Sequence, residues 1–509
     1  MTDHWTLVAC RLRAGASAIV FATLFCASGH SQEPKVTVSI DWKKTEYSLK
    51  TTATLQVVVN SPLRRDSSIH DSAWSALRNL KADYVRFVPW YPYPRLGVAE
   101  LNAPTKERTF WDFSLIDPLV EDFLEATDEH PVMLNFSTIP QWMFRTEAPI
   151  KFPDDPNEVV WSYEQGKELR DPTGKEVADY YARVANWYAK GGFADELGAF
   201  HPSRHRRKIA LWEVLNEPEY EHALSPQNYT NIYDAIVAAV HKELPETQFV
   251  GMSLAEPSSR PEFFEYFLDP KNHRPNTPLD WISYHFYAVP TADQTPAIQQ
   301  YTFFDQADKF LTSVRFIEAI RKRLSPQTKT AINEVGCILP ADIGQGAPIT
   351  DAAMIPKSYW NLCGAMFAYL YINLARQGID VLSSSQLVGY PTQFPSVTML
   401  DWQTGEPNAR YSVLKALREN FHPGDRCVAT DAKSAYLVAQ AFVGADGVRK
   451  LLLVNKRDRA LQVEIPGAHN GTETHVDVGT GAINSRLLSL QSDSVEVGGF
   501  SVAVIQFQN

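Results

Sequence analysis

The sequence predicts an α/β fold: a (β/α)8 TIM barrel with a C-terminal antiparallel β-sandwich domain. Between residues 53 and 422, eight short β-rich runs alternate with eight longer segments of helical periodicity. After residue 423 the long helical segments stop, and glycine turns separate short β-rich runs. Eight strand–helix units in series favour a closed parallel barrel, because each helix returns the chain to the start of the next strand.

The barrel elements follow in regular order. We predict strands at residues 55–60, 84–90, 132–137, 209–215, 249–254, 281–286, 330–333 and 381–387. We predict helices at residues 71–80, 115–126, 177–190, 227–244, 263–268, 304–323, 358–376 and 409–420. Ser225 suits the N-cap of the fourth helix and Pro226 its first turn. An open doubly wound sheet is the alternative, but Asn60-Ser61-Pro62 follows the first strand where that fold needs a glycine-rich turn.

The C-terminal region predicts the sandwich. Its strands are expected at residues 436–443, 450–454, 461–465, 475–478, 494–497 and 501–507. A run at 35–40 can complete the same sheets. The predicted organisation is therefore a signal peptide at 1–31, an N-terminal strand segment at 32–52 that joins the β-domain, a catalytic barrel at 53–422 and an accessory sandwich at 423–509.

The N-terminus has the pattern of an export signal. Arg11 and Arg13 precede an apolar stretch at 14–27, and small and polar residues follow at 28–31. We expect cleavage between about residues 27 and 32, which predicts a secreted or periplasmic protein without a membrane anchor. A buried N-terminal helix is the alternative, which the positive flank disfavours.

Charge and cysteine content exclude several classes of protein. The net charge is −11, and the basic residues form only one short cluster, at 204–208, so nucleic-acid binding is disfavoured. Past the signal peptide the cysteines are Cys337, Cys363 and Cys427, an odd number that gives no disulfide framework. Cys337 and Cys363 could pair. No Cys/His spacing resembles a metal site, and no cofactor is expected.

Two segments carry the chemistry. Residues 211–218 and 330–336 are apolar strand-like runs, and each ends in an Asn-Glu pair: Asn216-Glu217 and Asn333-Glu334. Both glutamates fall at the C-terminal ends of predicted barrel strands, the fourth and the seventh, where barrel enzymes gather their reactive groups. A glutamate at the end of a buried strand is costly unless it has a partner or a function. Two such carboxyls suit glycoside hydrolysis, with oligo- or polysaccharide as substrate.

The segment Trp212-Glu213-Val214-Leu215-Asn216-Glu217-Pro218 resembles the acid/base motif of clan A glycoside hydrolases. Within the clan the chain most resembles family 39, which includes β-xylosidases and α-L-iduronidases. Segments 111–117, 283–287 and 332–334 support this resemblance. Because clan A enzymes are retaining, the resemblance implies a covalent glycosyl-enzyme intermediate and carboxyl groups about 5–5.5 Å apart.

The residues suggest a role for each group. Glu217 is expected to be the general acid, with Trp212 and the apolar strand supplying desolvation. Glu334 is expected to be the nucleophile, kept ionised by Arg86 and Tyr287. Asn216 offers its amide to the sugar 2-hydroxyl.

Other candidates are equally well explained by structural roles. His285 could belong to the site or be a buried histidine bonded to backbone. Trp90 and Trp142, after strands two and three, could stack on sugar or merely pack. Glu213 is expected to form a structural ion pair, and Glu219 and Glu221 to be surface charges.

Strand eight departs from the clan pattern, since it lacks a Trp at its end. Gln386 or Tyr390 could replace it, or Trp402 could reach the site from the following loop. The sugar therefore stays open, with iduronidase-like or arabinosidase-like specificity as alternatives to a β-xylosidase. A barrel that binds carbohydrate without catalysis is the remaining alternative, and the sequence leaves the oligomeric state undetermined.

Overall fold

The computed structural model describes residues 35–148, 151–163, 166–480 and 486–508. The predicted signal peptide at 1–31 and its cleavage site lie outside the described residues. All the structure below belongs to one compact unit, which spans Lys35–Asn509.

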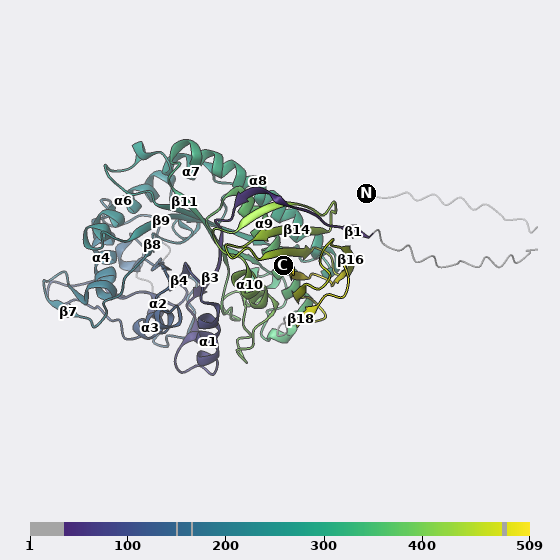
Figure 1. Ribbon diagram of the computed structural model, residues 1–509. Coiled ribbons are helices and arrows are strands. Elements are labelled where there is room, and N and C mark those ends of the chain that lie inside the picture. Colours follow the sequence, from purple (N-terminus) through teal and green to yellow (C-terminus); the bar gives the residue numbers. More distant parts are fainter. Residues whose placement is uncertain (1–34, 149–150, 164–165, 481–485, 509) are drawn as a thin grey trace, which may run out of the picture. The chain divides into compact units, whose positions relative to one another are not determined.

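Eight parallel strands close into a barrel, as predicted (Figure 1). They are β3 (Thr52–Val58), β4 (Val85–Val88), β5 (Val132–Leu134), β8 (Leu211–Glu213), β9 (Gln248–Leu254), β10 (Trp281–Ala288), β11 (Lys329–Cys337) and β12 (Val381–Ser384). Each strand pairs with its neighbours in chain order, and β12 pairs with β3 to close the ring. The predicted strands are all present, and their alternation with helices is the reason the sequence pattern found them.

Helices follow the barrel strands. The eight predicted ones are α1 (His70–Leu80), α3 (Asp117–Ala126), α4 (Lys175–Lys190), α6 (Pro226–Glu243), α7 (Pro261–Phe267), α8 (Pro296–Leu324), α9 (Lys357–Gln377) and α10 (Ala409–Asn420). Ser225 caps α6 as predicted, because its Oγ accepts the Asn228 N–H at 3.2 Å. Two single-turn helices, α2 (Pro94–Gly97) and α5 (Pro218–Glu221), were not predicted. The second of these shapes the site. Short 3-10 turns occur at Ser61–Leu63, Gln141–Met143, Pro270–Asn272, Pro340–Ile343, Ala352–Met354 and Pro395–Val397.

The C-terminal strands form two layers with the N-terminal strands, and the pairing within them is antiparallel except between β1 and β16. A seven-stranded sheet has the order β18-β17-β20-β15-β14-β13-β2, and a three-stranded sheet has the order β1-β16-β19. Their bounds are β1 (Val36–Thr37), β2 (Ser39–Ser48), β13 (Arg426–Asp431), β14 (Leu437–Val443), β15 (Arg449–Asn455), β16 (Leu461–Glu464), β17 (Thr472–Val476), β18 (Arg486–Ser489), β19 (Ser494–Val497) and β20 (Val502–Gln506). In Figure 1 the N-terminal strand β1 lies beside β16, with which it pairs in parallel. A separate hairpin joins β6 (Gly192–Ala194) to β7 (Phe200–Pro202).

One face of the seven-stranded sheet packs against α9 and α10 of the barrel. Phe442 of β14 meets Phe421, just past α10, with ring centroids 4.3 Å apart. Apolar residues of this face belong to the same buried cluster as the barrel core. The opposite face forms a second apolar cluster with the three-stranded sheet. Burial of both faces holds the sandwich against the barrel.

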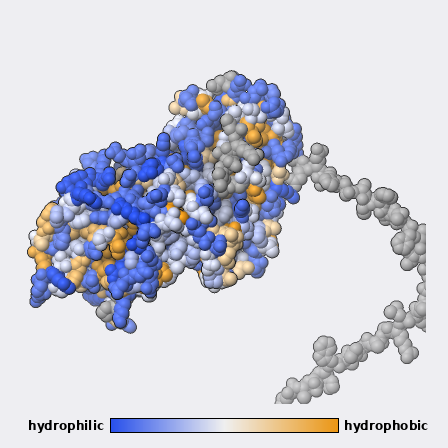
Figure 2. All heavy atoms as spheres, turned by 90° about the horizontal axis from the view of Figure 1, so that it is seen from below, coloured by the Kyte–Doolittle hydropathy of each residue, from blue (hydrophilic) through white to orange (hydrophobic). Residues whose placement is uncertain are grey.

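The barrel interior divides into an apolar end and a polar end. Met133, Leu211, Val250, Trp281, Ala331 and Val381 form a separate apolar cluster near the strand beginnings. Toward the strand ends the buried side chains become polar and charged, so the reactive groups lie at the C-terminal face. Hydrophilic residues dominate the face in Figure 2, with smaller hydrophobic patches between them. Within the described residues, no helix is long and apolar enough to span a bilayer.

Candidate active site

The backbone turns sharply at the end of β8. Leu215 has φ 64° and Glu217 has φ 41°, both in the left-handed region that non-glycine residues seldom adopt. The Glu217 N–H donates to the Ser253 carbonyl at 3.0 Å, and α5 starts at the next residue. This strained turn points the Glu217 carboxyl into the pocket, and such strain concentrates at functional sites.

A bulge places the second carboxyl. Along β11, Ile332 pairs with Tyr284 and Glu334 pairs with His285, so Asn333 is an extra residue in the ladder. Asn333 therefore points beneath the pocket, where its Nδ2 donates to Glu213 at 2.6 Å. Glu334 points to the pocket. The two Asn-Glu pairs look alike in sequence, yet Asn216 lines the pocket and Asn333 supports its floor.

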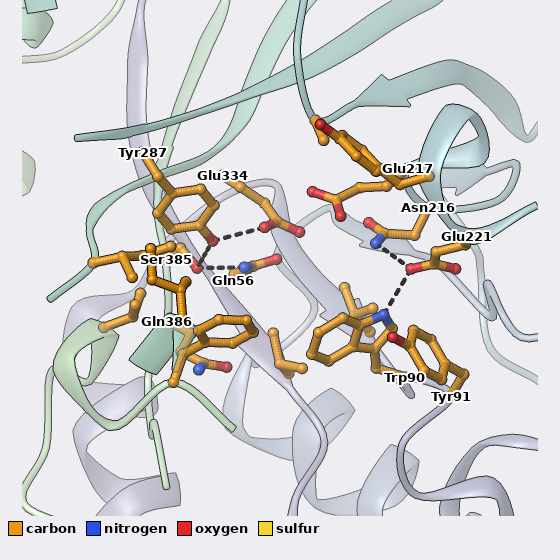
Figure 3. A pocket seen from close by; sticks show the side chains of 18 of the residues that line it. Gln56, Trp90, Tyr91, Asn216, Glu217, Glu221, Tyr287, Glu334, Ser385 and Gln386 are labelled. Carbon is orange, nitrogen blue, oxygen red and sulfur yellow. Dashed lines mark hydrogen bonds between the residues drawn. The ribbon is translucent and has the colours of Figure 1, made fainter. Parts of the chain in front are cut away.

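Folding brings Glu217 and Glu334 together, 117 residues apart in sequence. Their carboxylates lie side by side in Figure 3. One oxygen of each carboxylate and one nitrogen of His285 all lie within 4.8 Å of one another. His285 Nδ1 is 2.8 Å from Glu217 Oε1 and 3.6 Å from Glu334 Oε2. His285 is thus a bridge between the carboxylates, and the alternative of a histidine bonded only to backbone is wrong.

Arg86 lies beneath the pocket and is hydrogen-bonded to five residues of the site. It is fully buried, and its Nη1 donates to Glu334 Oε1 at 2.5 Å. Its other N–H groups donate to Glu213, Gln56, Asn216 and Ser253. The Tyr287 hydroxyl lies 2.7 Å from Glu334 Oε2, so both contacts that the sequence predicts for Glu334 are present.

Glu213 lies beneath the pocket, and its carboxylate is fully hydrogen-bonded. Its side chain is buried and accepts hydrogen bonds from Arg86, Asn135, Ser283 and Asn333. The predicted structural ion pair is confirmed. A buried carboxylate with this many donors is stable and has no free lone pair directed at the pocket.

Charges and hydrogen bonds around Glu334 determine its protonation state. Burial raises the pKa of Glu334, but the charges of His285 and Arg86 and the Tyr287 hydrogen bond outweigh burial, so its pKa lies below its usual value. Burial lowers the pKa of His285, but the negative charges of Glu334 and Glu217 outweigh burial. The pKa of His285 therefore lies above its usual value. Burial raises the pKa of Tyr287 well above its normal value, so it remains a donor. Glu334 is therefore held ionised.

The carboxylates open into a cavity of about 650 Å³, large enough for a sugar ring and part of its aglycone. Trp90, Tyr91, Trp161, Tyr220 and Phe394 supply its aromatic surfaces. Trp90 and Phe394 are nearly parallel, with ring centroids 6.1 Å apart. In the described residues, Glu217, His285 and Glu334 are also the one group of side chains with metal-ligand spacing. The positive charge of the Arg86 guanidinium, which lies beside Glu334, disfavours a metal ion at these three side chains.

Glu221 was wrongly predicted as a surface charge. It is 7% exposed and lines the pocket, and Glu219 is equally buried. The reason is α5, which folds back from Glu217 and turns both side chains inward. Glu221 Oε1 accepts from Trp90 Nε1 at 2.7 Å and from Asn216 Nδ2 at 2.8 Å, as Figure 3 shows. Glu221 therefore orients two pocket residues at once. A carboxyl four residues after the motif glutamate was the only sequence signal for it.

Burial raises the pKa of Glu221 well above its usual value, which makes a testable stability prediction. Because the folded-state pKa is raised, the native protein loses stability as pH rises above about 4.3, the value in an unfolded chain. The side chain introduced in the variant Glu221→Gln does not titrate. The unfolding free energy of the variant should therefore increase relative to that of wild type as pH rises from about 4 to about 8. Urea unfolding across this range measures the difference.

The same position should affect catalysis through Asn216 and Trp90. Glu221→Ala removes the shared acceptor and should lower kcat/KM about 100-fold by loosening both side chains. Glu221→Gln keeps an acceptor oxygen and should stay within about 10-fold of wild type. Equal losses in the two variants would contradict a positioning role.

Of the two tryptophans predicted to contact sugar, one lines the pocket and the other does not. Trp90 lines the pocket, whereas Trp142 is not among the lining residues. Its indole donates to the Glu100 carbonyl at 2.8 Å, and Arg170 lies over its ring. Trp142, which lies in the segment between β5 and α4, therefore packs against Glu100 and Arg170.

After β12, Gln386 lines the pocket, while Trp402 is buried in the core. The aromatic ring that reaches the pocket from this side is Phe394, which the sequence pattern did not identify. Phe394 lies eight residues past Gln386 in an irregular loop, so no periodicity marks it. Cys337 and Cys363, which the sequence allowed to pair, are both buried free thiols in this structure.

Many solved structures have a similar fold. A glucosidase from Croceicoccus marinus is similar over 93% of this chain and 99% of its own, with a TM-score of 0.58 and 14% identity. A family 51 α-L-arabinofuranosidase from Bifidobacterium longum has a TM-score of 0.59 and 12% identity over 93% and 100% of the two chains. A GH30 endoxylanase from Clostridium papyrosolvens has a TM-score of 0.56 and 11% identity over the same shares.

These likenesses establish the fold. It is the TIM barrel with a C-terminal sandwich that the sequence predicts. The three structures named here are a glucosidase, an endoxylanase of family GH30 and an α-L-arabinofuranosidase of family 51. The finer resemblance to family 39 remains a prediction. No protein-family model matches the sequence, and no curated protein does.

Proposed function

We propose that this protein is a retaining glycoside hydrolase, with Glu334 as nucleophile and Glu217 as acid/base. The observation that carries the proposal is the separation of the two carboxylates, whose facing oxygens lie within 4.8 Å. Retaining enzymes need about 5–5.5 Å between carboxyl groups, whereas inverting enzymes need about 6.5–9.5 Å to fit a water between them.

The two glutamates would act in turn. In the first step Glu334 attacks the anomeric carbon, and the glycosidic bond breaks as the Glu217 proton passes to the leaving oxygen. In the second step Glu217 takes a proton from water, which attacks the same carbon and releases Glu334. Asn216 would bind the sugar 2-hydroxyl, and its position in the pocket lining with both carboxyls supports this role.

The contacts of each carboxyl support this assignment of roles. Glu334 accepts hydrogen bonds from Arg86 and Tyr287. These bonds stabilise the ionised carboxylate that a nucleophile requires. Glu217 contacts His285 and its side chain is 22% exposed, so it can exchange protons with solvent. His285 lies between them and would balance charge as the Glu217 proton leaves and returns.

We further propose a β-xylosidase-like activity for a protein exported by its segment 1–31, with a catalytic barrel at 53–422 and a structural sandwich at 423–509. Support comes from the motif at 212–218 and from neighbours that are a glucosidase, an endoxylanase and an arabinofuranosidase. An arabinosidase-like specificity is the second candidate, favoured by the family 51 neighbour.

Mechanism-based labelling tests the proposal. Incubation with a panel of 2-deoxy-2-fluoroglycosides should add one sugar to the protein, and peptide mass spectrometry should find it on Glu334. The sugar that labels fastest reports specificity. Glu334→Gln should take no label, and Glu125→Gln, a change to an exposed carboxyl on α3, should label like wild type.

Glu217→Gln supplies an independent test of the acid. Its kcat/KM should fall about 10²–10⁴-fold for substrates with poor leaving groups, and much less for dinitrophenyl glycosides, whose leaving group needs no proton. An equal loss for both substrates would remove Glu217 from this role. Sugar binding without labelling would instead identify a non-catalytic carbohydrate-binding barrel.

A further inference from the structure

We infer that the pocket takes an uncharged sugar and excludes uronic acids, a restriction that rests on the function proposed above. The inference concerns which glycosides enter the site between the two carboxyls. It follows from the charges that line the cavity and from the hydrogen bonds already made by the cations beneath it.

The lining carries charge of one sign. Among the described residues that line the cavity, every acidic or basic side chain is a glutamate: Glu217, Glu221, Glu256 and Glu334. Burial favours the protonated form of Glu221, and the acid role requires a proton on Glu217, so Glu334 and Glu256 carry the negative charge. Glu256 is exposed at the end of β9, where it faces any anion that approaches. A sugar carboxylate would thus meet repulsion in a partly desolvated space, where Coulomb energies are larger than in water.

Arg86 cannot bind a substrate carboxylate. A guanidinium has five N–H donors, and Arg86 directs all five to protein acceptors: Glu213, Gln56, Glu334, Asn216 and Ser253. It is also 0% exposed, so it lies beneath the pocket floor. An anionic substrate would have to break one of these bonds to reach it.

His285 is equally committed. Its Nδ1 contacts Glu217 at 2.8 Å, and its Nε2 lies 3.0 Å from Ser253 Oγ. Both ring nitrogens are used, and the ring is 1% exposed. Glu221, even when protonated, offers one neutral hydrogen bond and no compensating charge.

The rest of the lining suits neutral hydroxyls. Gln56, Asn216, Ser385 and Gln386 present amide and hydroxyl groups between apolar and aromatic walls. A neutral ring can form hydrogen bonds with these groups, and none of them supplies the positive charge that a uronate carboxylate requires.

Matched aryl glycosides that differ only at C6 test the inference. We expect kcat/KM for the glucoside or galactoside to exceed that of the glucuronide or galacturonide by at least about 100-fold. An aryl β-xyloside and an aryl α-L-iduronide extend the comparison. A uronide hydrolysed within about 10-fold of its neutral partner, or better, overturns the inference while leaving the glycosidase assignment intact.

Binding gives a readout that does not need turnover. Calorimetric titration of Glu217→Gln with methyl glycosides should show heat for a neutral sugar and a weaker signal for its uronate. Uronate binding as tight as neutral binding overturns the inference, as does failure of every neutral sugar to bind. If neutral sugars bind but neither labelling nor turnover occurs, the catalytic proposal is wrong and the inference about sugar charge stands.

A charge reversal isolates the electrostatic cause. Glu256→Lys should reduce the preference for neutral over anionic substrate several-fold, because it places a cation at the cavity wall. Glu125→Lys makes the same change in net charge near the end of α3 and should leave the preference unaltered. An equal effect of both variants, or of neither, would contradict exclusion by the pocket charges.

Discussion

Replacing Glu334 by Gln should lower kcat/KM for an aryl glycoside by about 10⁴-fold or more. The change removes the atom that would bond to the anomeric carbon while keeping the shape of the side chain. Gln also retains an oxygen for Arg86 Nη1 and a group within reach of Tyr287. The loss should therefore appear in catalysis far more than in folding. Initial rates at several substrate concentrations, with the melting temperature of the same samples, separate the two effects.

A smaller variant sharpens this test. Glu334→Ala opens space beside the anomeric carbon, so a small external nucleophile such as formate or azide should restore turnover and give a product of inverted configuration. Rescue identifies the missing group as the nucleophile, because a merely structural residue would not respond to an added anion. Activity within about 10-fold of wild type in Glu334→Gln would end the assignment.

Replacing Arg86 by Met should have the largest effect on stability, about 3–5 kcal/mol, together with loss of activity. Met fills similar volume without charge, and it leaves Glu213 and Glu334 as buried carboxyls lacking their cation. Five acceptors also lose their donor at once. Urea unfolding at neutral pH measures the change in free energy.

The pH dependence of this variant has a definite sign. Because the folded-state pKa of Glu334 lies below its usual value, its contribution to stability is present above about pH 4.3 and is lost as pH falls. Arg86→Met removes a cause of that depression, so the variant should lose most stability relative to wild type at neutral pH and less near pH 4. A loss that is independent of pH would show that packing, and not charge, is what Arg86 supplies.

Arg86→Lys is the matched control. Lys keeps the charge but has three donors in place of five, so two of the five acceptors must lose a bond. We expect stability between wild type and Arg86→Met. The double variant Glu213→Gln with Arg86→Met should recover part of the loss, since it removes one unpaired buried charge. Additive effects of the two substitutions would contradict a direct ion pair.

Local sequence was sufficient for the architecture. The eight strands were found because parallel barrel strands, buried on both faces, are short apolar runs that alternate with amphipathic helices. The sequence pattern missed β13 and most of β2 (Ser39–Ser48), a ten-residue strand without a buried residue. Strand β13 (Arg426–Asp431) begins and ends on a charged residue, and it exists because β2 and β14 pair with its two edges.

The sequence by itself determined the barrel, the sandwich and the two carboxyls at the ends of strands four and seven. Only the tertiary structure decided which way the neighbouring side chains point. The left-handed turn at Glu217 sends Glu221 inward, and the bulge at Asn333 sends that amide beneath the floor. Both outcomes depend on backbone angles stabilised by contacts distant in sequence, such as the bond from the Glu217 N–H to the Ser253 carbonyl. Periodicity reports burial along a regular strand or helix, and it carries no information where the backbone departs from regular geometry.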